Sequence, residues 1–203
     1  MVDPSGPRLV LASASPFRRR MLEAAGLSFA VARADVDEAA VKGDLLGCGA
    51  DPPGIAQRLA VAKAEAVSAR LPDALVIGAD QVLACGREIF NKPASVAQAR
   101  EQLLYLRGKT HQLHTAVALA AHERAAWTRV ETATLAMRPF TDAFLSEYLA
   151  RLGENVCRTV GAYEIEGAGI QLFERIEGDM FTVIGLPLLP LLSELRARGV
   201  VAT

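Results

Sequence analysis

Residues 8–26 read RLVLASASPFRRRMLEAAG and contain the pattern of a strand, a tight turn and a helix in direct succession. The apolar run over 8–14 has the length of a buried strand. Ser15 and Pro16 form an N-cap and first-turn pair, and Gly26 is a typical helix stop, so the pattern predicts a helix over about 16–25. This is the first unit of a chain in which strands and helices alternate.

The alternation continues to the end of the chain. The run ALVIGAD, residues 74–80, predicts another buried strand, and VLACGREIF predicts a hairpin that turns at Gly86. Interleaved strands and helices predict an α/β fold with a mixed, twisted sheet and flanking helices. The remaining expected elements are a strand over 28–34, a loop over 43–54, helices over 54–71, 95–106, 141–152 and 187–198, strands over 111–121 and 126–137 joined by a turn at 122–124, and a glycine-punctuated, strand-like segment over 161–186.

The composition is that of one globular domain. The chain has 203 residues, of which 51% are hydrophobic and 22% charged, so a sizeable core is easily buried. We expect residues 1–7 to form a disordered leader and residues 8–203 a single domain. The 22 basic residues nearly balance the 23 acidic ones, and only 5% of the residues are aromatic. This balance argues against a field that would hold DNA or an anionic membrane and against a base-stacking platform for nucleic acid.

The cysteines and the apolar runs indicate no disulfide framework, zinc site or membrane segment. Cys48, Cys85 and Cys157 are odd in number and far apart, without a CxxC pair. The longest apolar run, 183–192, is interrupted by prolines and falls short of the roughly 18 residues that span a bilayer. The N-terminus has no signal-peptide pattern, so we expect a cytoplasmic location.

The turn SASP is a candidate anion site. Free N–H groups at a helix start and the positive end of the helix dipole attract phosphate, and small residues let it approach. Ser13 and Ser15 add hydroxyl donors, and Arg18 and Arg19 can supply forked hydrogen bonds to phosphate oxygens. The alternative is an ordinary N-cap followed by a solvated basic turn.

Two carboxylates are candidates for metal binding and water activation. Asp80 ends a buried strand, and open α/β sheets place their ligands at such strand ends. Glu38 closes the run DVDE, residues 35–38, in an expected loop. Hard cations such as Mg²⁺ bind carboxylates together with substrate phosphates, and a carboxylate near the metal can take a proton from water. Alternatively, the run is a solvated loop and Asp80 has a structural partner.

Two lysines are candidates for neutralising phosphate charge. Lys63 lies near the apolar stripe of the helix expected from Gly54, and Lys92 precedes Pro93 in an expected turn. Either can stabilise charge that develops as a bond to phosphorus breaks. The alternative for both is an ordinary solvated lysine.

Other suggestive patterns do not fit a known kind of site. The sequence GAG at 167–169 lacks the third glycine of a dinucleotide-binding turn. His111 and His114 lie three residues apart on an expected strand, so their side chains are expected on opposite faces and not on one metal.

A series of motifs runs through the chain in a fixed order: LVLASASPFRRRMLEAAGLSF, DVDE, RLAVAKAEA, VIGADQV, NKP, LRGKTHQLHTAVAL, VGAYEIEGAGIQLFERIEG and VIGLPLLPL. Together they cover about 8–199, nearly the whole chain. In this order they resemble the Maf family, whose members are nucleoside triphosphate pyrophosphatases once described as septum-formation inhibitors.

The resemblance implies a two-lobed fold like that of inosine triphosphate pyrophosphatases, with the nucleotide in a central cleft. It implies hydrolysis of a nucleoside triphosphate to the monophosphate and pyrophosphate with a divalent metal cation (Mg²⁺, Mn²⁺ or Co²⁺), and a homodimer is common. Asp80 matches the family's proton acceptor. Asp80 and Glu38 are our candidate metal ligands. The candidate catalytic residues are Asp80, Lys63 and Lys92. The polar cleft residues of the family match Ser13, Arg18, Glu38, Lys63 and Lys92.

The dTTP- and UTP-hydrolysing members of the family typically have the motifs SPRR and GADT and a glutamine before the glycine of the later GAY segment. This chain departs from that pattern at three positions. Phe17, Gln81 and Glu166 stand at these positions and resemble the branch that acts on 7-methyl-GTP, where the aromatic residue is usually Trp. A methylated guanine carries positive charge, which favours an aromatic face and a nearby carboxylate. Glu166 can also accept hydrogen bonds from unmethylated guanine, and Phe17 can instead be a core residue of the first helix.

We therefore expect a pyrophosphatase for modified or non-canonical nucleotides, with 7-methyl-GTP favoured. A pyrophosphatase for dTTP and UTP, or for nucleotides in general, is the alternative within the enzyme class. A nucleotide-binding regulator of septum formation that acts through a protein partner is the alternative of another class, although the intact acids and lysines argue for catalysis.

Overall fold

The computed structural model describes residues 8–202, so the leader expected over 1–7 lies outside the described residues. The strands are β1 (Arg8–Leu11), β2 (Ala30–Val31), β3 (Ala74–Cys85), β4 (Glu88–Phe90), β5 (Thr110–Ala121), β6 (Arg124–Met137) and β7 (Phe173–Glu177). The α-helices are α1 (Pro16–Ala24), α2 (Glu38–Gly47), α3 (Pro52–Ser68), α4 (Val96–Leu106), α5 (Asp142–Leu152), α6 (Met180–Ile184) and α7 (Leu188–Ala197). Three 3₁₀ turns, η1 (Gly153–Arg158), η2 (Val160–Ala162) and η3 (Ala168–Leu172), connect α5 to β7.

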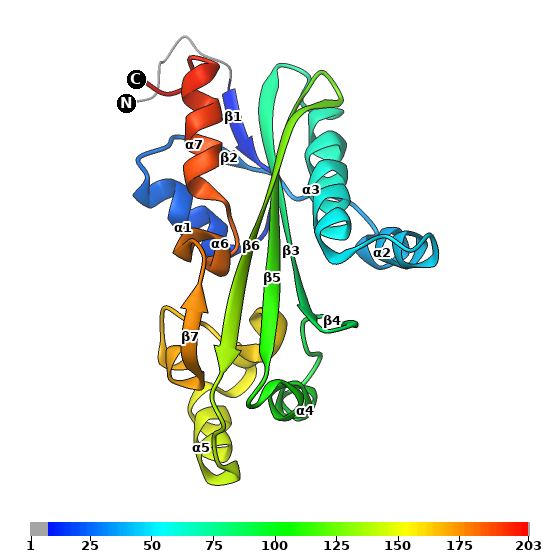
Figure 1. Ribbon diagram of the computed structural model, residues 1–203. Coiled ribbons are helices and arrows are strands. Elements are labelled where there is room, and N and C mark those ends of the chain that lie inside the picture. Colours follow the sequence, from blue (N-terminus) through cyan, green and yellow to red (C-terminus); the bar gives the residue numbers. More distant parts are fainter. Residues whose placement is uncertain (1–7, 203) are drawn as a thin grey trace.

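One mixed sheet runs through the molecule in the order β2-β1-β3-β5-β6-β7, and β4 pairs with β3 off this path. The pairs of β1 with β2 and β3 are parallel, whereas all other pairs are antiparallel. Helices α1, α6 and α7 cover one face of its upper part and α3 covers the other, with α2 beside α3 (Figure 1). The predicted α/β class with a mixed sheet and flanking helices is confirmed.

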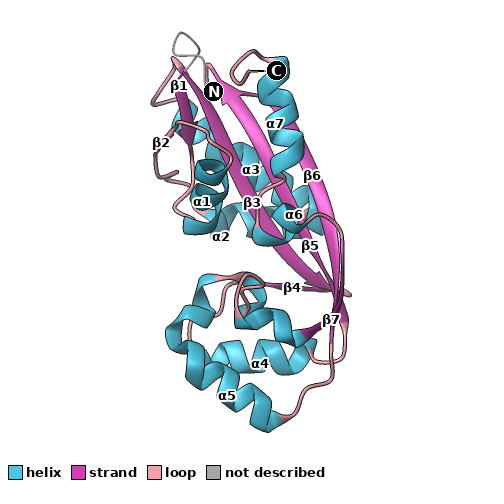
Figure 2. Cartoon of the chain, turned by 90° about the vertical axis from the view of Figure 1, so that its left-hand side faces the viewer, coloured by secondary structure: helices cyan, strands magenta, loops and turns pink. Residues whose placement is uncertain are grey.

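The upper and lower parts of the sheet have separate cores. In the upper part, Leu11 and Ile77 pack toward α1 and α7, while Val76 packs toward α3. In the lower part, the ends of β3, β5 and β6 pack against α4, α5 and the 3₁₀ turns around Leu103 and Leu135. Figure 2 shows these two helical groups separated along the long strands. The long strands are therefore the structural link between two packed halves.

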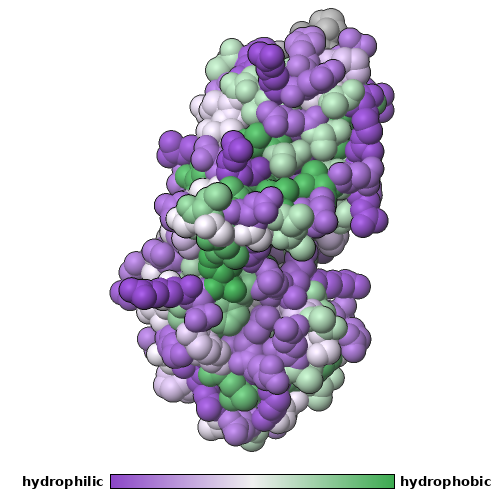
Figure 3. All heavy atoms as spheres, turned by 90° about the vertical axis from the view of Figure 1, so that its right-hand side faces the viewer, coloured by the Kyte–Doolittle hydropathy of each residue, from purple (hydrophilic) through white to green (hydrophobic). Residues whose placement is uncertain are grey.

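The sheet is open on one side of β3 between these halves. Strand β1 pairs with β3 only as far as Ile77, and β4 pairs with it only from Leu83 onward. Within residues 8–202, the segment 78–82 of β3 thus has β5 on one side and no strand on the other. The molecular surface narrows between the upper and lower parts (Figure 3). Side chains of segment 78–82 can therefore meet a ligand at this opening.

Two segments differ from the sequence-based expectation. The loop predicted over 43–54 and the acidic loop ending at Glu38 are wrong in part, because α2 begins at Glu38 and continues to Gly47. Asp37 caps this helix, since its carboxylate accepts a hydrogen bond of 3.0 Å from the amide of Ala40. The helix forms from this cap although Gly43 and Gly47 lie within it.

The strand-like segment predicted over 161–186 is also wrong for most of its length. Only Phe173–Glu177 forms a strand, and the remainder contains 3₁₀ turns and helix α6. Gly161 and Ala162 have left-handed φ angles of 77° and 60°, which a strand does not accommodate. The strand predicted over 28–34 is likewise reduced to Ala30–Val31.

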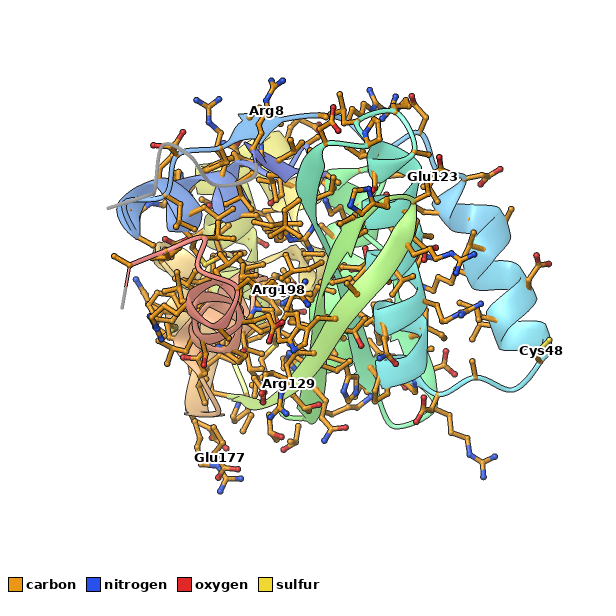
Figure 4. The ribbon with its side chains drawn as sticks, turned by 90° about the horizontal axis from the view of Figure 1, so that it is seen from above. Arg8, Cys48, Glu123, Arg129, Glu177 and Arg198 are labelled. Carbon is orange, nitrogen blue, oxygen red and sulfur yellow. The ribbon has the colours of Figure 1, made fainter. Side chains whose placement is uncertain are left out.

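The strand predicted over 74–80 does not end at Asp80, because β3 continues to Cys85 and Asp80 lies in its middle. The other predicted elements are confirmed within a few residues. The hairpin turns at Gly86, Ser95 caps α4, and Thr141 caps α5. Among the residues described, no helix is long and apolar enough to cross a membrane. The thiols of all three cysteines are free, and Cys48 lies at the far end of α2, away from the sheet (Figure 4).

Helix α3 packs directly on β3 at Gly78. A Cβ atom at this position would lie 2.2 Å from the carbonyl oxygen of Ala60 and 2.7 Å from the amide nitrogen of Ala64. Both atoms belong to the helix backbone, so they cannot move aside as a flexible side chain could. Only glycine allows this close approach.

We predict that Gly78→Ala destabilises the protein by about 3 kcal/mol or more, because the methyl group forces α3 away from β3. Urea unfolding should show a lower midpoint. The matched control is Gly47→Ala on α2, where a Cβ meets nothing within 4 Å, and it should be neutral or slightly stabilising. Equal stability of Gly78→Ala and the parent protein would contradict the close packing.

A buried histidine in the lower core makes stability depend on pH. His111 is 1% exposed, and its Nε2 lies 2.8 Å from the hydroxyl of Tyr163. Burial lowers the pKa of His111 from 6.5 to about 4. The unfolded chain therefore binds a proton between these pH values while the folded protein does not, and stability falls as the pH is lowered through this range.

We predict a loss of about 3 kcal/mol in unfolding free energy from this residue between pH 7 and pH 4. The measurement is urea unfolding at several pH values for the parent and for His111→Gln, which should lose this part of the pH dependence. His122→Asn, an exposed change in the β5–β6 turn, is the control and should keep it. An unchanged pH dependence in His111→Gln would show that His111 is not the titrating group.

Candidate active site

Two neighbouring residues of the open β3 segment point to opposite faces of the sheet. Asp80 is opposite Ala116 and Gln81 is opposite Thr115 in the register with β5. Because side chains alternate along a strand, Asp80 faces α3, while Gln81 faces α6. The opening beside β3 is therefore bordered by a carboxylate on one face and an amide on the other.

Asp80 is held by a buried lysine. The Nζ atom of Lys63 lies 2.6 Å from a carboxylate oxygen of Asp80 and 3.0 Å from one of Glu38. The side chains of Lys63 and Asp80 are 9% and 11% exposed, whereas that of Glu38 is 56% exposed. Lys63 belongs to the buried stripe of α3, with Leu59 and Val67 four residues on either side. Two carboxylates from different elements thus converge on one ammonium group at the opening.

The start of α1 forms the upper border of the opening. Ser15 caps the helix, and Ser13 Oγ accepts hydrogen bonds of 3.2 Å from the Ser15 amide and from the guanidinium of Arg18. Arg18 Nε also donates to the carbonyl of Gly185 at 2.8 Å. Burial lowers the pKa of Arg18, while the nearby charge of Asp80 raises it. Arg18 is therefore fixed in position by two hydrogen bonds, and the charge of Asp80 acts on its guanidinium.

Lys92 borders the opening from the lower part. It follows β4 and precedes Pro93. Burial lowers the pKa of Lys92, and the positive charges of Arg18 and Lys63 lower it further. The charge of Asp80 acts in the opposite direction. Lys92 is thus close enough to the upper part for the charges of its cations and its acids to change the pKa of Lys92.

Lys42 is a further cation at this opening, which the sequence did not reveal. It lies on α2, one turn after Glu38, and its Nζ atom donates a hydrogen bond to Asn91 Oδ1 next to Lys92. Burial lowers the pKa of Lys42, while the charge of Asp80 raises it. The i, i+4 spacing from Glu38 would have indicated this position if α2 had been predicted. Four cations, Arg18, Lys42, Lys63 and Lys92, therefore gather around two carboxylates, and this excess of positive charge favours a polyanionic ligand.

A pocket lies on the Gln81 side of the sheet and is lined by Phe17, Gln81, Glu166, Glu164, Tyr163, Leu113 and others. The structure thus brings together the three residues singled out at the specificity positions. The amide nitrogen of Gln81 donates to Thr115 Oγ1 at 2.9 Å and to the carbonyls of Thr182 and Val183 at 3.0 and 3.1 Å. These bonds fix the amide so that its oxygen is left to accept from a ligand. We call this cavity the base pocket, after the substrate-specificity role that the family resemblance implies for Phe17, Gln81 and Glu166.

Phe17 lines the pocket instead of belonging to the core. It is half-buried, and the buried residues of α1 are Met21 and Leu22. Arg20, one turn further along α1, has its guanidinium 4.9 Å from the centre of the Phe17 ring. The same guanidinium lies 3.6 Å from the carboxylate of Glu166.

The structure does not bring Arg19 to the site. Its side chain is 62% exposed and pairs with Glu23 at 2.7 Å along the outer face of α1. The helical period explains the difference: residues three apart, such as Phe17 and Arg20, share a face, while residues two apart do not. Applied to the sequence, this period would have indicated Arg20 in place of Arg19.

Comparison with known proteins identifies the family to which this chain is similar. A model of the family described as "Maf-like protein" matches residues 8–198. A 7-methyl-GTP pyrophosphatase of Rhizobium johnstonii is 51% identical over 195 residues, which are 96% of this chain and 98% of that protein. A protein of the same name from Brucella abortus is 52% identical over 93% of this chain and 95% of its own length. A nucleoside triphosphate pyrophosphatase of Paramagnetospirillum magneticum is 51% identical over 94% of this chain and 98% of that protein.

These likenesses extend over nearly all of the described fold, from β1 through the last helix. The matched range contains the open segment of β3, the start of α1 and the residues that line the base pocket, so it is not confined to one motif. The chain therefore belongs to the Maf family.

Proposed function

We propose that this protein is a nucleoside triphosphate pyrophosphatase that prefers a nucleotide with a 7-methylated guanine base. The observation that carries the proposal is the Lys63–Asp80–Glu38 cluster, which lies at an opening bordered by further cations. The names of the Maf relatives, three of which are given above, support the same activity. The two packed halves would form the lobes of a nucleotide cleft within a single domain over 8–203.

In this proposal the triphosphate lies along the open segment of β3. Arg18, Lys63 and Lys92 neutralise its charge, and the hydroxyl of Ser13 and the amide of Phe17 at the start of α1 donate hydrogen bonds to its oxygens. Ser15 contributes through its helix cap. Positive charge is needed most when the anhydride bond breaks, because pyrophosphate leaves with the bonding electron pair.

Asp80 is the proposed proton acceptor. Its carboxylate faces the opening from β3 and takes the proton of the water that attacks phosphorus, while the bond between the α- and β-phosphates breaks. Lys63 holds the carboxylate in position through the contact of 2.6 Å. The products are the nucleoside monophosphate and pyrophosphate.

The donor set fits a divalent cation that is shared with the substrate. Among residues 8–202 no three His, Cys, Asp or Glu side chains gather as a complete metal site. Glu38 and Asp80 nevertheless both reach one ammonium group, and Mg²⁺ typically takes one or two protein carboxylates and completes its shell with phosphates and waters. Glu38 and Asp80 would hold Mg²⁺, Mn²⁺ or Co²⁺, which would withdraw charge from the phosphate oxygens when bound.

The base pocket suits a positively charged purine. An aromatic face attracts a cation, so the ring of Phe17 favours 7-methylguanine over a neutral base. The two acids of the pocket, Glu164 and Glu166, add negative potential. The oxygen of Gln81 supplies an acceptor for an exocyclic amine. The homodimer that the family resemblance implies stays a prediction.

We predict that Asp80→Asn lowers kcat by about 10²- to 10⁴-fold, because the amide cannot accept the proton of water. Pyrophosphate release measures kcat, and circular dichroism together with binding of the monophosphate product shows whether the fold and the site are retained. Asp44→Asn, an exposed change on α2, is the control and should leave turnover unchanged. Full turnover in Asp80→Asn would remove Asp80 as the proton acceptor.

We predict that pyrophosphate release is fastest with 7-methyl-GTP in a panel that also contains GTP, dTTP, UTP, CTP and ATP. Release should require Mg²⁺, Mn²⁺ or Co²⁺, and a chelator should abolish it. Phe17→Leu keeps the apolar volume but loses the aromatic face, so the preference for 7-methyl-GTP over GTP should fall about fivefold.

The panel also separates the alternatives. A preference for dTTP or UTP would retain the chemistry and overturn the proposed base selectivity. Release from none of the nucleotides, together with stoichiometric capture of a division protein, would favour a binding regulator of septum formation.

A further inference from the structure

Arg20 contacts two residues of the base pocket from outside it. Its guanidinium lies 4.9 Å from the ring centre of Phe17 and 3.6 Å from the carboxylate of Glu166, although Arg20 itself is not among the residues that line the pocket. The two contacts connect α1 with the segment between η2 and η3. Arg20 is therefore a cation at the rim of a pocket whose walls carry Glu164 and Glu166.

The pairing changes the charge that a bound base meets. Without Arg20 the pocket walls carry two negative charges, and with Arg20 the charge of Glu166 is largely balanced. A positively charged base gains from unbalanced negative charge and is repelled by a second cation nearby. A neutral base is much less affected by either change.

We propose that Arg20 is a specificity-determining residue that balances Glu166 and thereby moderates the preference of the pocket for a positively charged base. The inference rests on the proposed function, since it assumes that the base of a nucleotide occupies this pocket. It predicts that the preference for a 7-methylated guanine is weaker than Phe17, Glu164 and Glu166 alone would produce.

The test compares the parent protein with Arg20→Gln, which removes the charge and keeps a polar side chain. Calorimetry gives the dissociation constants of 7-methylguanosine monophosphate and guanosine monophosphate, and kinetics give kcat and KM for the two triphosphates. The ratio of affinities should shift about fivefold toward the methylated nucleotide, and kcat should stay unchanged because Arg20 lies on the base side of the sheet. The shift should diminish at high salt.

Two variants separate charge from structure. Arg20→Lys keeps the charge and should keep the ratio of the parent. Arg175→Gln is the matched control, because it removes one exposed arginine that pairs with Glu177 at 3.0 Å and leaves the pocket untouched. Figure 4 shows Glu177 directed away from the body of the protein. This control should not change the ratio.

A double variant tests whether Arg20 acts through Glu166. In a Glu166→Gln background the effect of Arg20→Gln should shrink, because the carboxylate that Arg20 balances is gone. The inference is overturned if Arg20→Gln prefers the methylated monophosphate over guanosine monophosphate no more strongly than the parent does. It is also overturned if Arg20→Gln has the same effect in the Glu166→Gln background as in the parent. If the parent still hydrolyses 7-methyl-GTP, the proposed function stands in either case. A parent that binds neither monophosphate and hydrolyses no nucleotide overturns both.

Discussion

The contact of 2.6 Å between Lys63 and Asp80 joins helix α3 to strand β3 where the sheet is open. Removing two charges from water costs several kcal/mol per ion, so each side chain can be buried only if the other stays close. Helix and strand are therefore restricted to one relative position. Gly78, two residues before Asp80, permits this position because a larger residue would collide with the helix backbone. Packing and charge impose the same constraint, and the remaining parts of the site are arranged around it.

The alternation of side chains along β3 places two groups of candidate residues on opposite faces of the sheet. Asp80 faces the charged cluster, and Gln81, the next residue, faces the base pocket on the other side of the sheet. A nucleotide at the open strand edge can meet both, since the edge is the place where the two faces join. In the proposed function, changes in the base pocket therefore alter base preference while the groups that contact the phosphates stay fixed.

Local signals in the sequence predicted much of the fold. A helix follows each of the caps Ser15, Ser95 and Thr141. The apolar run at 74–80 forms the first part of the buried strand β3. The failures lie where distant contacts determine the structure. Residues 161–172 fold into 3₁₀ turns against the lower core, and α2 lies beside α3, neither of which the local pattern indicates. The opening of the sheet depends on where β1 and β4 stop pairing with β3, a property of register that no single segment contains.

The candidate site could be predicted in its types of residue more completely than in its arrangement. The sequence indicated Lys63, Glu38 and Asp80 separately, and the structure unites them. Overall likeness does not decide base preference, because relatives of about 51% identity have both the specific and the general name. The decision then depends on few side chains around one pocket. Arg20 contacts Glu166 at 3.6 Å at the rim of this pocket, so the charge at the pocket depends on a residue outside its wall as well as on the residues that line it.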